Sequence, residues 1–400
     1  MYVKPTCPTP LKLLLVLVIV AEVVAIGFLA ADRAGALDTL GASAPEAPAS
    51  NEVASAGSQG GSIGGGGSAG ENAASVSQPQ SPQTPSDAGS AAEPISITVT
   101  FAGDCVLGTD ANRENSRSFN SRWEDEGADA SYFLRNVADL FGADDLTIVN
   151  LEGALTDRGK RVDKSFAFRG KPDYAEILSS GSVEAASLAN NHSRDYGQEG
   201  YDDTIEALGA DGVKAFDINR IAYFDVKGAK VAVVGAYAPE DGEGNDQAVA
   251  DDIAAARAEG AQLVIVYAYW GGEYESNPSE EQVALGHAAI DAGADVVVGT
   301  HPHIIQGWER YKGRYIVYSL GNFCFGGNTN PDDKDCLIFQ QTFTVTGDEV
   351  AKNDDVDFIA ASVSTETDRN TYQPVLAEGD EKARIDAKVQ EAADRIAAAS

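Results

Sequence analysis

A hydrophobic run in this chain ends at two histidines that are separated by one residue. This spacing occurs in metal sites. His301 and His303 follow residues 294–300, whose centre is Val-Val-Val, in a protein with only four histidines. Imidazole nitrogen suits Zn, Fe and related metals. The alternative is that both side chains are hydrogen-bonded polar residues at a loop entrance. The spacing favours the metal site.

The same event, a hydrophobic run that stops at a side chain able to bind metal, occurs at three more places: Asp104 follows residues 95–101, Glu152 follows residues 146–149, and Asn191 and His192 follow residues 184–188. The carboxyl ends of strands in an open α/β sheet line one crevice, so we expect these side chains to converge there. Taken singly, Asp104 and Asn191 also suit turns or helix caps. Independent caps have no reason to recur at strand ends, so the pattern predicts one metal-dependent site.

Carboxylate, amide oxygen and imidazole ligands together suit Mn, Fe or Zn better than Ca, which prefers oxygen alone. We therefore expect a divalent metal as cofactor, with one or two ions.

We consider five further polar side chains for a role at this site. Glu273 either orients a ligand or acts as a base, or it is a solvated loop carboxylate. Arg169 either holds a carboxylate or phosphate with paired hydrogen bonds, or it lies at the surface. Tyr269 and Asn322 are candidate metal or substrate contacts, and Tyr269 is otherwise a strand-end aromatic. His287 falls inside the predicted helix 280–292, so we interpret it as structural.

Two cysteines lie on neighbouring predicted strands. Cys324 falls in residues 315–325 and Cys336 in residues 336–345, joined by a loop rich in Gly, Asn and Asp. The two either form a disulfide in an oxidising compartment or remain free buried thiols, and the sequence leaves both open.

The first quarter of the chain is not typical of a globular domain. Residues 13–31 are almost continuously apolar and follow two lysines, which predicts a cytoplasmic segment at 1–12 and a transmembrane signal anchor at 13–31. The alternative is a cleaved secretory signal. Residues 32–94 are rich in Gly, Ser, Pro and Ala, which predicts a disordered linker. We expect a single-pass protein of the cell membrane whose main domain lies outside the cytoplasm.

The remainder has the pattern of an α/β domain. Between residues 95 and 346, apolar runs alternate with helix-like segments at 132–141, 173–179, 201–208, 249–260 and 280–292. Residues 347–400 form a C-terminal extension, partly helical, with an amphipathic helix near its end. The net charge of −33 argues against nucleic-acid binding.

Several short motifs, in this order, resemble the capsule-synthesis CapA family, which is similar to the calcineurin-like metallophosphoesterases: Gly103-Asp-Cys-Val-Leu-Gly108, Asn150-Leu-Glu152, Leu188-Ala-Asn-Asn-His192 with Asp195-Tyr-Gly197, Trp270-Gly-Gly-Glu-Tyr274, residues 293–303 and Tyr318-Ser-Leu-Gly-Asn-Phe323. The resemblance implies a four-layer α/β/β/α sandwich of the metallophosphoesterase type. It also implies metal ligands at Asp104, Glu152, Asn191, His301 and His303, with His192 near the leaving group.

Two positions depart from the patterns that the resemblance implies. Val106 stands where the phosphoesterases carry a histidine, and Tyr269 stands where the CapA pattern has one. Each change removes a neutral ligand, so we expect one tightly bound metal and a second site that is weak or absent.

The resemblance implies a metal-dependent hydrolase that takes part in the synthesis, export, attachment or trimming of an anionic envelope polymer such as poly-γ-glutamate. Membrane capsule-synthase subunits are the expected protein partners. Two alternatives stay open: a general metallophosphoesterase, and a non-catalytic scaffold that binds polymer for a synthase.

Overall fold

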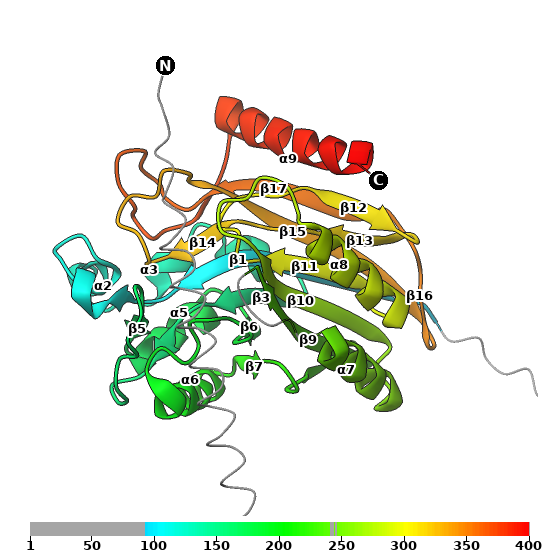
Figure 1. Cartoon of the computed structure of the whole chain (residues 1–400), viewed down its shortest axis with the longest axis horizontal. Coiled ribbons are helices and arrows are strands. Elements are labelled where there is room, and N and C mark those ends of the chain that lie inside the picture. Colours follow the sequence, from blue (N-terminus) through cyan, green and yellow to red (C-terminus); the bar gives the residue numbers. More distant parts are fainter. Residues whose placement is uncertain (1–92, 241–243, 245, 400) are drawn as a thin grey trace, which may run out of the picture. The chain divides into compact units, whose positions relative to one another are not determined.

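Two β-sheets pack face to face, and helices cover their outer faces (Figure 1). The structure is a computed structural model that describes residues 93–240, 244 and 246–399. The predicted segments at 1–12 and 13–31, and the linker up to residue 92, lie outside the described residues. Within the described part, no helix has the length and apolar character needed to cross a bilayer.

The first sheet has nine strands. Its main order is β18-β17-β15-β1-β3-β6-β7, with β14 paired to β1 and β16 paired to β15. The bounds are β1 Ile95–Val106, β3 Leu146–Leu151, β6 Ala185–Ser187, β7 Lys214–Phe216, β14 Asn322–Phe325, β15 Asp335–Thr346, β16 Glu349–Val350, β17 Val356–Ser362 and β18 Val375–Leu376.

The second sheet has six strands in the order β12-β13-β11-β10-β9-β8. Its strands are β8 Ala222–Val226, β9 Ala229–Pro239, β10 Leu263–Gly271, β11 Val296–Thr300, β12 Trp308–Tyr311 and β13 Arg314–Val317. The strands β9, β10, β11 and β13 run parallel. Strand β10 is buried along its whole length, which is why its sequence reads as a continuous apolar run. A small third sheet joins β2 Thr109–Asp110, β5 Phe168–Gly170 and β4 Ala154–Leu155.

Three hydrophobic cores define four layers. The central core joins the two sheets and includes Phe101 of β1 and Ile265 of β10. A second core lies between the nine-stranded sheet and its helices, α2 Phe119–Asp125, α3 Ser131–Leu134, α4 Ala138–Phe141, α5 Ala175–Ser180 and α6 Gly197–Ala210. The third core lies between the six-stranded sheet and α7 Asp246–Ala258 and α8 Glu280–Ala292. The order of the layers is therefore α/β/β/α.

The sequence of α8 explains both of its ends. Ser279 accepts a hydrogen bond from the backbone N–H of Gln282, whose side chain bonds back to the backbone N–H of Ser279. This capping box satisfies two donors that the first turn would leave unbonded. Gly293 ends the helix in the left-handed region, at φ 114°.

One predicted strand is wrong. The apolar residues 315–325 form two strands in different sheets: β13 ends at Val317 and β14 begins at Asn322. Gly321 has φ 75° in the link between them. Its carbonyl oxygen would lie 1.9 Å from a Cβ placed on Gly103, so there is no room for a side chain at Gly103. The chain crosses from one sheet to the other here, which hydrophobicity alone does not reveal.

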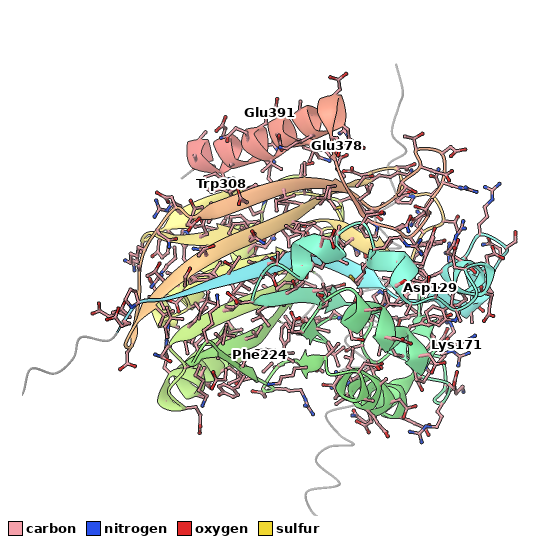
Figure 2. The ribbon with its side chains drawn as sticks, turned by 180° about the vertical axis from the view of Figure 1, so that it is seen from behind. Asp129, Lys171, Phe224, Trp308, Glu378 and Glu391 are labelled. Carbon is pink, nitrogen blue, oxygen red and sulfur yellow. The ribbon has the colours of Figure 1, made fainter. Side chains whose placement is uncertain are left out.

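The C-terminal segment continues the same fold. The boundary that the sequence suggested at residue 346 differs from the structure, because β17 pairs along β15 in the nine-stranded sheet. The last helix, α9 Gly379–Ala399, contacts β17 and β12 (Figure 1) and buries Ile385 and Val389 in the central core. Viewed from behind, Trp308 of β12 lies next to α9 (Figure 2).

Three cysteines of the described part are free and buried. The disulfide suggested for Cys324 and Cys336 is not formed; the Cys324 thiol instead donates to the carbonyl oxygen of Tyr372 at 3.4 Å. Both belong to the core beneath the helices, where burial raises the pKa of each thiol. They pack there as small apolar side chains.

Candidate metal centre

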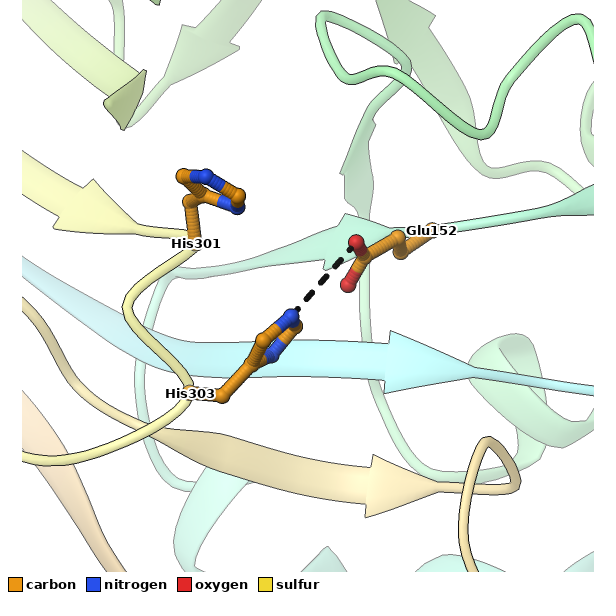
Figure 3. Close-up of side chains that lie close together, drawn as sticks. All are labelled: Glu152, His301 and His303. Atoms are coloured by element: carbon orange, nitrogen blue, oxygen red, sulfur yellow. Dashed lines mark ion pairs between the residues drawn. The ribbon is translucent and has the colours of Figure 1, made fainter. Parts of the chain in front are cut away.

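Three buried side chains bring metal-binding atoms together at the strand ends. Glu152 directly follows β3, while His301 and His303 follow β11 (Figure 3). One ligand atom from each of the three lies within 4.8 Å of the others. His303 Nε2 is 3.9 Å from Glu152 Oε1. The two sheets therefore contribute donors to one point, as the positions of the strand ends predict.

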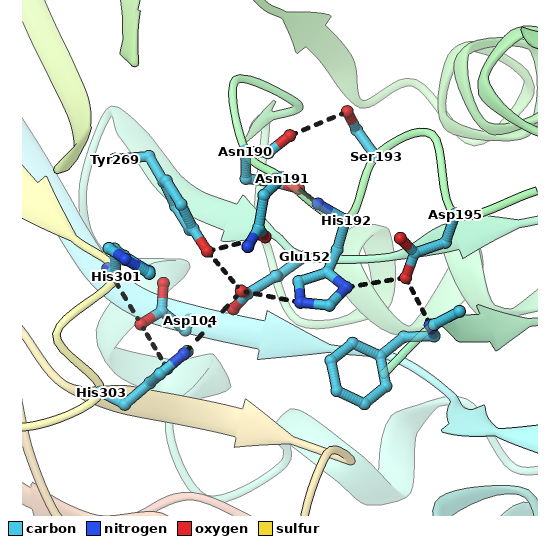
Figure 4. A network of polar contacts seen from close by, with 12 residues as sticks. Asp104, Glu152, Asn190, Asn191, His192, Ser193, Asp195, Tyr269, His301 and His303 are labelled. Atoms are coloured by element: carbon cyan, nitrogen blue, oxygen red, sulfur yellow. Dashed lines mark hydrogen bonds and ion pairs between the residues drawn. The ribbon is translucent and has the colours of Figure 1, made fainter. Parts of the chain in front are cut away.

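Asp104 lies beside this group. Asn150 Nδ2 donates to its Oδ1 at 2.8 Å, and the backbone N–H of His301 donates to its Oδ2 at 3.3 Å. His303 Nδ1 is 3.2 Å from the same Oδ2 (Figure 4). The same nitrogen is 3.0 Å from Asn322 Oδ1. Asp104 and Glu152 therefore lie on opposite sides of the His303 ring. A carboxylate that bonds the second ring nitrogen of a metal-binding histidine holds that ring in its orientation.

The Tyr269 hydroxyl joins two of the predicted ligands. Its oxygen lies 2.8 Å from Glu152 Oε1 and 2.8 Å from Asn191 Oδ1 (Figure 4). The hydroxyl has one proton and can donate to only one of these two oxygens. If the Asn191 amide is turned, its NH2 donates to the hydroxyl, and the hydroxyl donates to Glu152. Burial, followed by the Glu152 and Asp104 charges, holds the pKa of Tyr269 well above its ordinary value. Tyr269 is thus a neutral donor, with its ring 4.2 Å from that of His301.

His192 is oriented by Asp195. Its Nδ1 is 2.7 Å from Asp195 Oδ2, and its Nε2 faces Glu152 Oε1 at 3.9 Å. The backbone N–H of Phe168 donates to Asp195 Oδ2 at 2.5 Å, and Lys164 Nζ lies 2.5 Å from Oδ1. The carboxylate therefore accepts the Nδ1 proton of His192 and leaves Nε2 directed at the site.

Burial and charge act in opposite directions on the two central groups. Burial raises the pKa of the Glu152 carboxyl, and the His303 imidazole lowers it only in part. Burial lowers the pKa of His303, but the Glu152 and Asp104 carboxylates outweigh it and raise the pKa to about 9. The two carboxylates therefore favour a positive charge between them.

These residues fit a divalent metal. Glu152 Oε2 is buried without a hydrogen-bond partner among the described residues, and a buried carboxylate oxygen without a partner is costly. A cation at this point would offset that cost. One carboxylate and two imidazoles form a donor set that suits Fe, Zn or Mn.

The remaining predicted residues lie at different distances from this centre. Asn322 begins β14 beside Asp104 and also donates from Nδ2 to the His303 carbonyl oxygen at 3.2 Å. Glu273 is exposed in the loop after β10, where its charge raises the pKa of His303. Arg169 instead stacks over the Tyr196 ring, at 4.5 Å. The structure thus brings Asn322 into the site. The contact of Arg169 is with Tyr196, which is not one of the three donor residues.

The sequence motifs include two supporting groups to which no role was assigned. Asn150 and Asn190 form an amide chain: Asn190 Nδ2 donates to Asn150 Oδ1 at 2.9 Å, and Asn190 Oδ1 accepts from the His192 N–H at 3.0 Å. Asp195 is the second group, and its spacing of three residues from His192 was the available signal. A cavity of about 940 Å³ between α8 and α9 is separate, since none of its lining residues belongs to this site.

This fold and site define a protein whose two sheets meet at a buried carboxylate and imidazole donor group. The sequence profile of the bacterial capsule synthesis protein PGA_cap family matches residues 98–327. The chain therefore belongs to this family, and the resemblance to CapA proteins is confirmed.

Curated relatives agree with the family. The capsule biosynthesis protein CapA of Bacillus anthracis is 33% identical over 256 residues, 57% of this chain and 60% of that one. The PGA biosynthesis protein CapA of Bacillus subtilis is 29% identical over 251 residues, 57% of this chain and 63% of that one. The match thus spans about three fifths of each relative's length. Among solved structures, a phosphatase of Mycoplasma pneumoniae aligns at 15% identity with a TM-score of 0.43, over 70% of this chain and 95% of that chain.

Proposed function

We propose that this protein acts on an anionic capsule polymer such as poly-γ-glutamate, with a divalent metal held by Glu152, His301 and His303. The convergence of these three buried donors within 4.8 Å is the observation that carries the proposal. The names of the Bacillus relatives, which concern capsule and PGA biosynthesis, support the choice of polymer.

The proposed reaction is hydrolysis or transfer at an amide or phosphoester bond. When bound, the metal would supply Lewis-acid polarisation of the bond under attack. His192 would exchange a proton with the leaving group through Nε2, because Asp195 holds its Nδ1 at 2.7 Å. Tyr269 would keep Glu152 in position through the 2.8 Å contact with Oε1.

We further propose a single metal ion. Val106, which stands where the phosphoesterase pattern has histidine, is fully buried in a small apolar cluster with Phe168 and Phe325. This cluster offers no donor at the position where a second ion would need one. Mn, Fe and Zn remain the candidate ions.

The setting of the reaction is part of the same proposal. The apolar residues 13–31 would anchor the chain in the membrane with residues 95–399 outside the cytoplasm, where capsule polymer lies. Capsule-synthase subunits in that membrane are the proposed partners.

Metal analysis of the purified full chain tests the proposal. His301→Ala and His303→Ala should each abolish stoichiometric Mn, Fe or Zn. His287→Ala is the matched control, because His287 also bonds a glutamate, Glu309, at 2.8 Å, yet it lies outside the site. The metal-loaded wild type should shorten poly-γ-glutamate on a sizing column, and chelated protein should not. No bound metal under any loading condition would refute the proposed chemistry.

A scaffold is the second candidate function. Val106 and Tyr269 favour it, because each replaces a ligand that the family resemblance implies. Polymer production in cells that carry Glu152→Gln would separate the two functions: it should fall for the enzyme and persist for the scaffold. Turnover of small chromogenic phosphoesters would instead indicate a general metallophosphoesterase.

A further inference from the structure

Two large hydrophobic side chains of the described part are exposed, and ring contacts link both to the metal centre. Tyr274 is 63% exposed and Phe166 is 41% exposed. Single exposed apolar side chains are common and need no explanation when they are scattered. These two are not scattered, because each contacts a ring that belongs to the site or packs against it.

Tyr274 is held over one side of the site by its backbone. Its ring centroid is 6.1 Å from that of His303. Its N–H donates at 2.8 Å to the carbonyl oxygen of Pro302, the residue between the two histidines. Its φ of 62° lies in the left-handed region, which is strained for a bulky side chain. Such strain concentrates at binding and catalytic sites, and here it presents an exposed ring that adds little to the core.

Phe166 borders the opposite side. Its ring centroid is 6.2 Å from that of Phe168, which is 4.5 Å from the His192 ring. The guanidinium carbon of Arg113 lies 4.2 Å from the centre of the Phe166 ring. This side of the site thus combines an exposed aromatic face with a positive charge.

The metal centre lies between these two rings. His192 Nε2 and His303 Nε2 are each 3.9 Å from Glu152 Oε1. The contacts therefore run from Phe166 through Phe168 and His192 to Glu152, and from Glu152 through His303 to Tyr274. An extended chain that follows this series of contacts between the two rings passes the metal site.

Building on the proposed function, we infer that Phe166 and Tyr274 are two binding positions that hold an extended anionic polymer strand across the metal centre. Methylene segments of the strand pack on the two ring faces, and a carboxylate pairs with Arg113. Aromatic side chains give large contact area at low entropic cost, and guanidinium matches carboxylate geometry. A local cation is needed because the chain has a net charge of −33, which repels an anionic polymer.

The test measures binding of a fluorescent γ-linked glutamate oligomer to the metal-loaded full chain at low temperature. Tyr274→Gly removes the ring and also relieves the positive φ, so the melting temperature should be unchanged or higher. If the ring has no role in binding, the affinity should also be unchanged. The inference predicts about tenfold or greater loss of affinity with metal content retained. Tyr274→Phe, which keeps the ring, should bind within about twofold of wild type.

Phe166→Ala should weaken binding to a similar degree. Its matched control is Phe224→Ala, because the Phe224 ring also carries a cation, Lys214 Nζ at 4.5 Å, but lies on the edge strand β8 (Figure 2). The control should bind as wild type does. An uncharged dextran of similar length should not compete with the oligomer.

The failures of the two proposals are distinguishable. Unchanged affinity in both Tyr274→Gly and Phe166→Ala, in a wild type that binds metal and polymer, would overturn this inference alone. A wild type that binds neither metal nor oligomer would overturn the proposed function and this inference together. Loss of affinity in Phe224→Ala as large as in Phe166→Ala would also overturn the inference.

Discussion

His303 and Asp104 form a buried pair: His303 Nδ1 lies 3.2 Å from Asp104 Oδ2, while the Nε2 of the same ring faces Glu152 at 3.9 Å. One imidazole therefore separates two carboxylates that otherwise have no reason to lie so close together. The carboxylate on the Nδ1 side fixes the tautomer and the plane of the ring, and the nitrogen on the other side stays directed at the donor group.

Metal affinity should therefore follow a graded order. His303→Ala removes a donor, and Glu152→Gln replaces the charged carboxylate by a neutral amide; both should abolish stoichiometric binding. Asp104→Asn keeps the donors but weakens the support of the ring, and should raise the metal Kd by about 10-fold to 100-fold. Titration with Zn(II) and Co(II) measures both effects. If Asp104→Asn lost metal as completely as His303→Ala, Asp104 would be a direct ligand, as the sequence predicted.

Tyr269→Phe tests whether the phenol acts as a hydrogen-bond donor or as a metal ligand. The variant removes the donor to Glu152 Oε1 and leaves a buried carboxylate with less support, so it should destabilise the protein by about 1–3 kcal/mol in urea unfolding. Metal stoichiometry should be retained. The Fe(III)-loaded wild type should lack a visible phenolate charge-transfer band, since the Tyr269 hydroxyl is hydrogen-bonded to Glu152 and Asn191, at 2.8 Å each. A band that disappears in Tyr269→Phe would contradict this prediction.

The positions of the site residues were predictable from the sequence to the extent that strand ends determine them. Glu152 and His303 follow continuous apolar runs, and the parallel strands β3 and β11 bring both to the carboxyl edges of their sheets. The contact of Tyr269 with Glu152 was not predictable, because it joins residues 117 positions apart in different sheets. It depends on how the two sheets pack, which strand periodicity does not encode.

The fold shows the same limit at two places. The break between β13 and β14 follows from a close approach of Gly103 and Gly321, and one apolar run spans both strands. The amphipathic pattern correctly predicted α9. It did not reveal that Ile385 packs in the core between the sheets, because the partner surface is formed by distant strands.

The attachment of α9 should depend on pH through Asp335. Arg384 donates to both carboxylate oxygens of Asp335, at 2.7 and 2.6 Å, and Lys388 donates to one at 2.9 Å. Burial raises the pKa of Asp335, but these two cations outweigh burial and lower it below the ordinary value. A lowered folded-state pKa stabilises the fold fully above the unfolded value of about 3.9. That stability is lost as the pH falls from about 4 through the folded-state pKa.

Asp335→Asn should accordingly cost about 2 kcal/mol of unfolding free energy at pH 7, the scale of hydrogen bonds to a charged group. The difference from wild type should shrink as urea unfolding is repeated at pH 4 and pH 3. Asp386→Asn is the control on the same helix: its pair with Lys382, at 2.6 Å, is exposed and should contribute only about 0.3–0.5 kcal/mol. An Asp335→Asn effect that is constant from pH 7 to pH 3 would refute the linkage.

Gln306 connects the two loops that present the candidate site residues of the six-stranded sheet. It is fully buried, and its Nε2 donates to the carbonyl oxygens of Glu275 at 2.9 Å and Asn277 at 3.2 Å, in the loop that also contains Tyr274. Its Oε1 accepts from Gln282 of α8 at 3.0 Å. Gln306 itself lies three residues after His303, so one side chain fixes the loop after β11 relative to the loop after β10.

Gln306→Leu should therefore loosen both loops, raising the metal Kd by about tenfold and changing the visible spectrum of the Co(II)-loaded protein. Gln341→Leu is the matched control, because Gln341 is also buried but its Oε1 has no partner among the described residues. Because that oxygen has no hydrogen-bond partner, its removal leaves no donor unsatisfied, and the spectrum should not change. A Co(II) spectrum that is identical in wild type and Gln306→Leu would show that the histidine loop holds its geometry without Gln306.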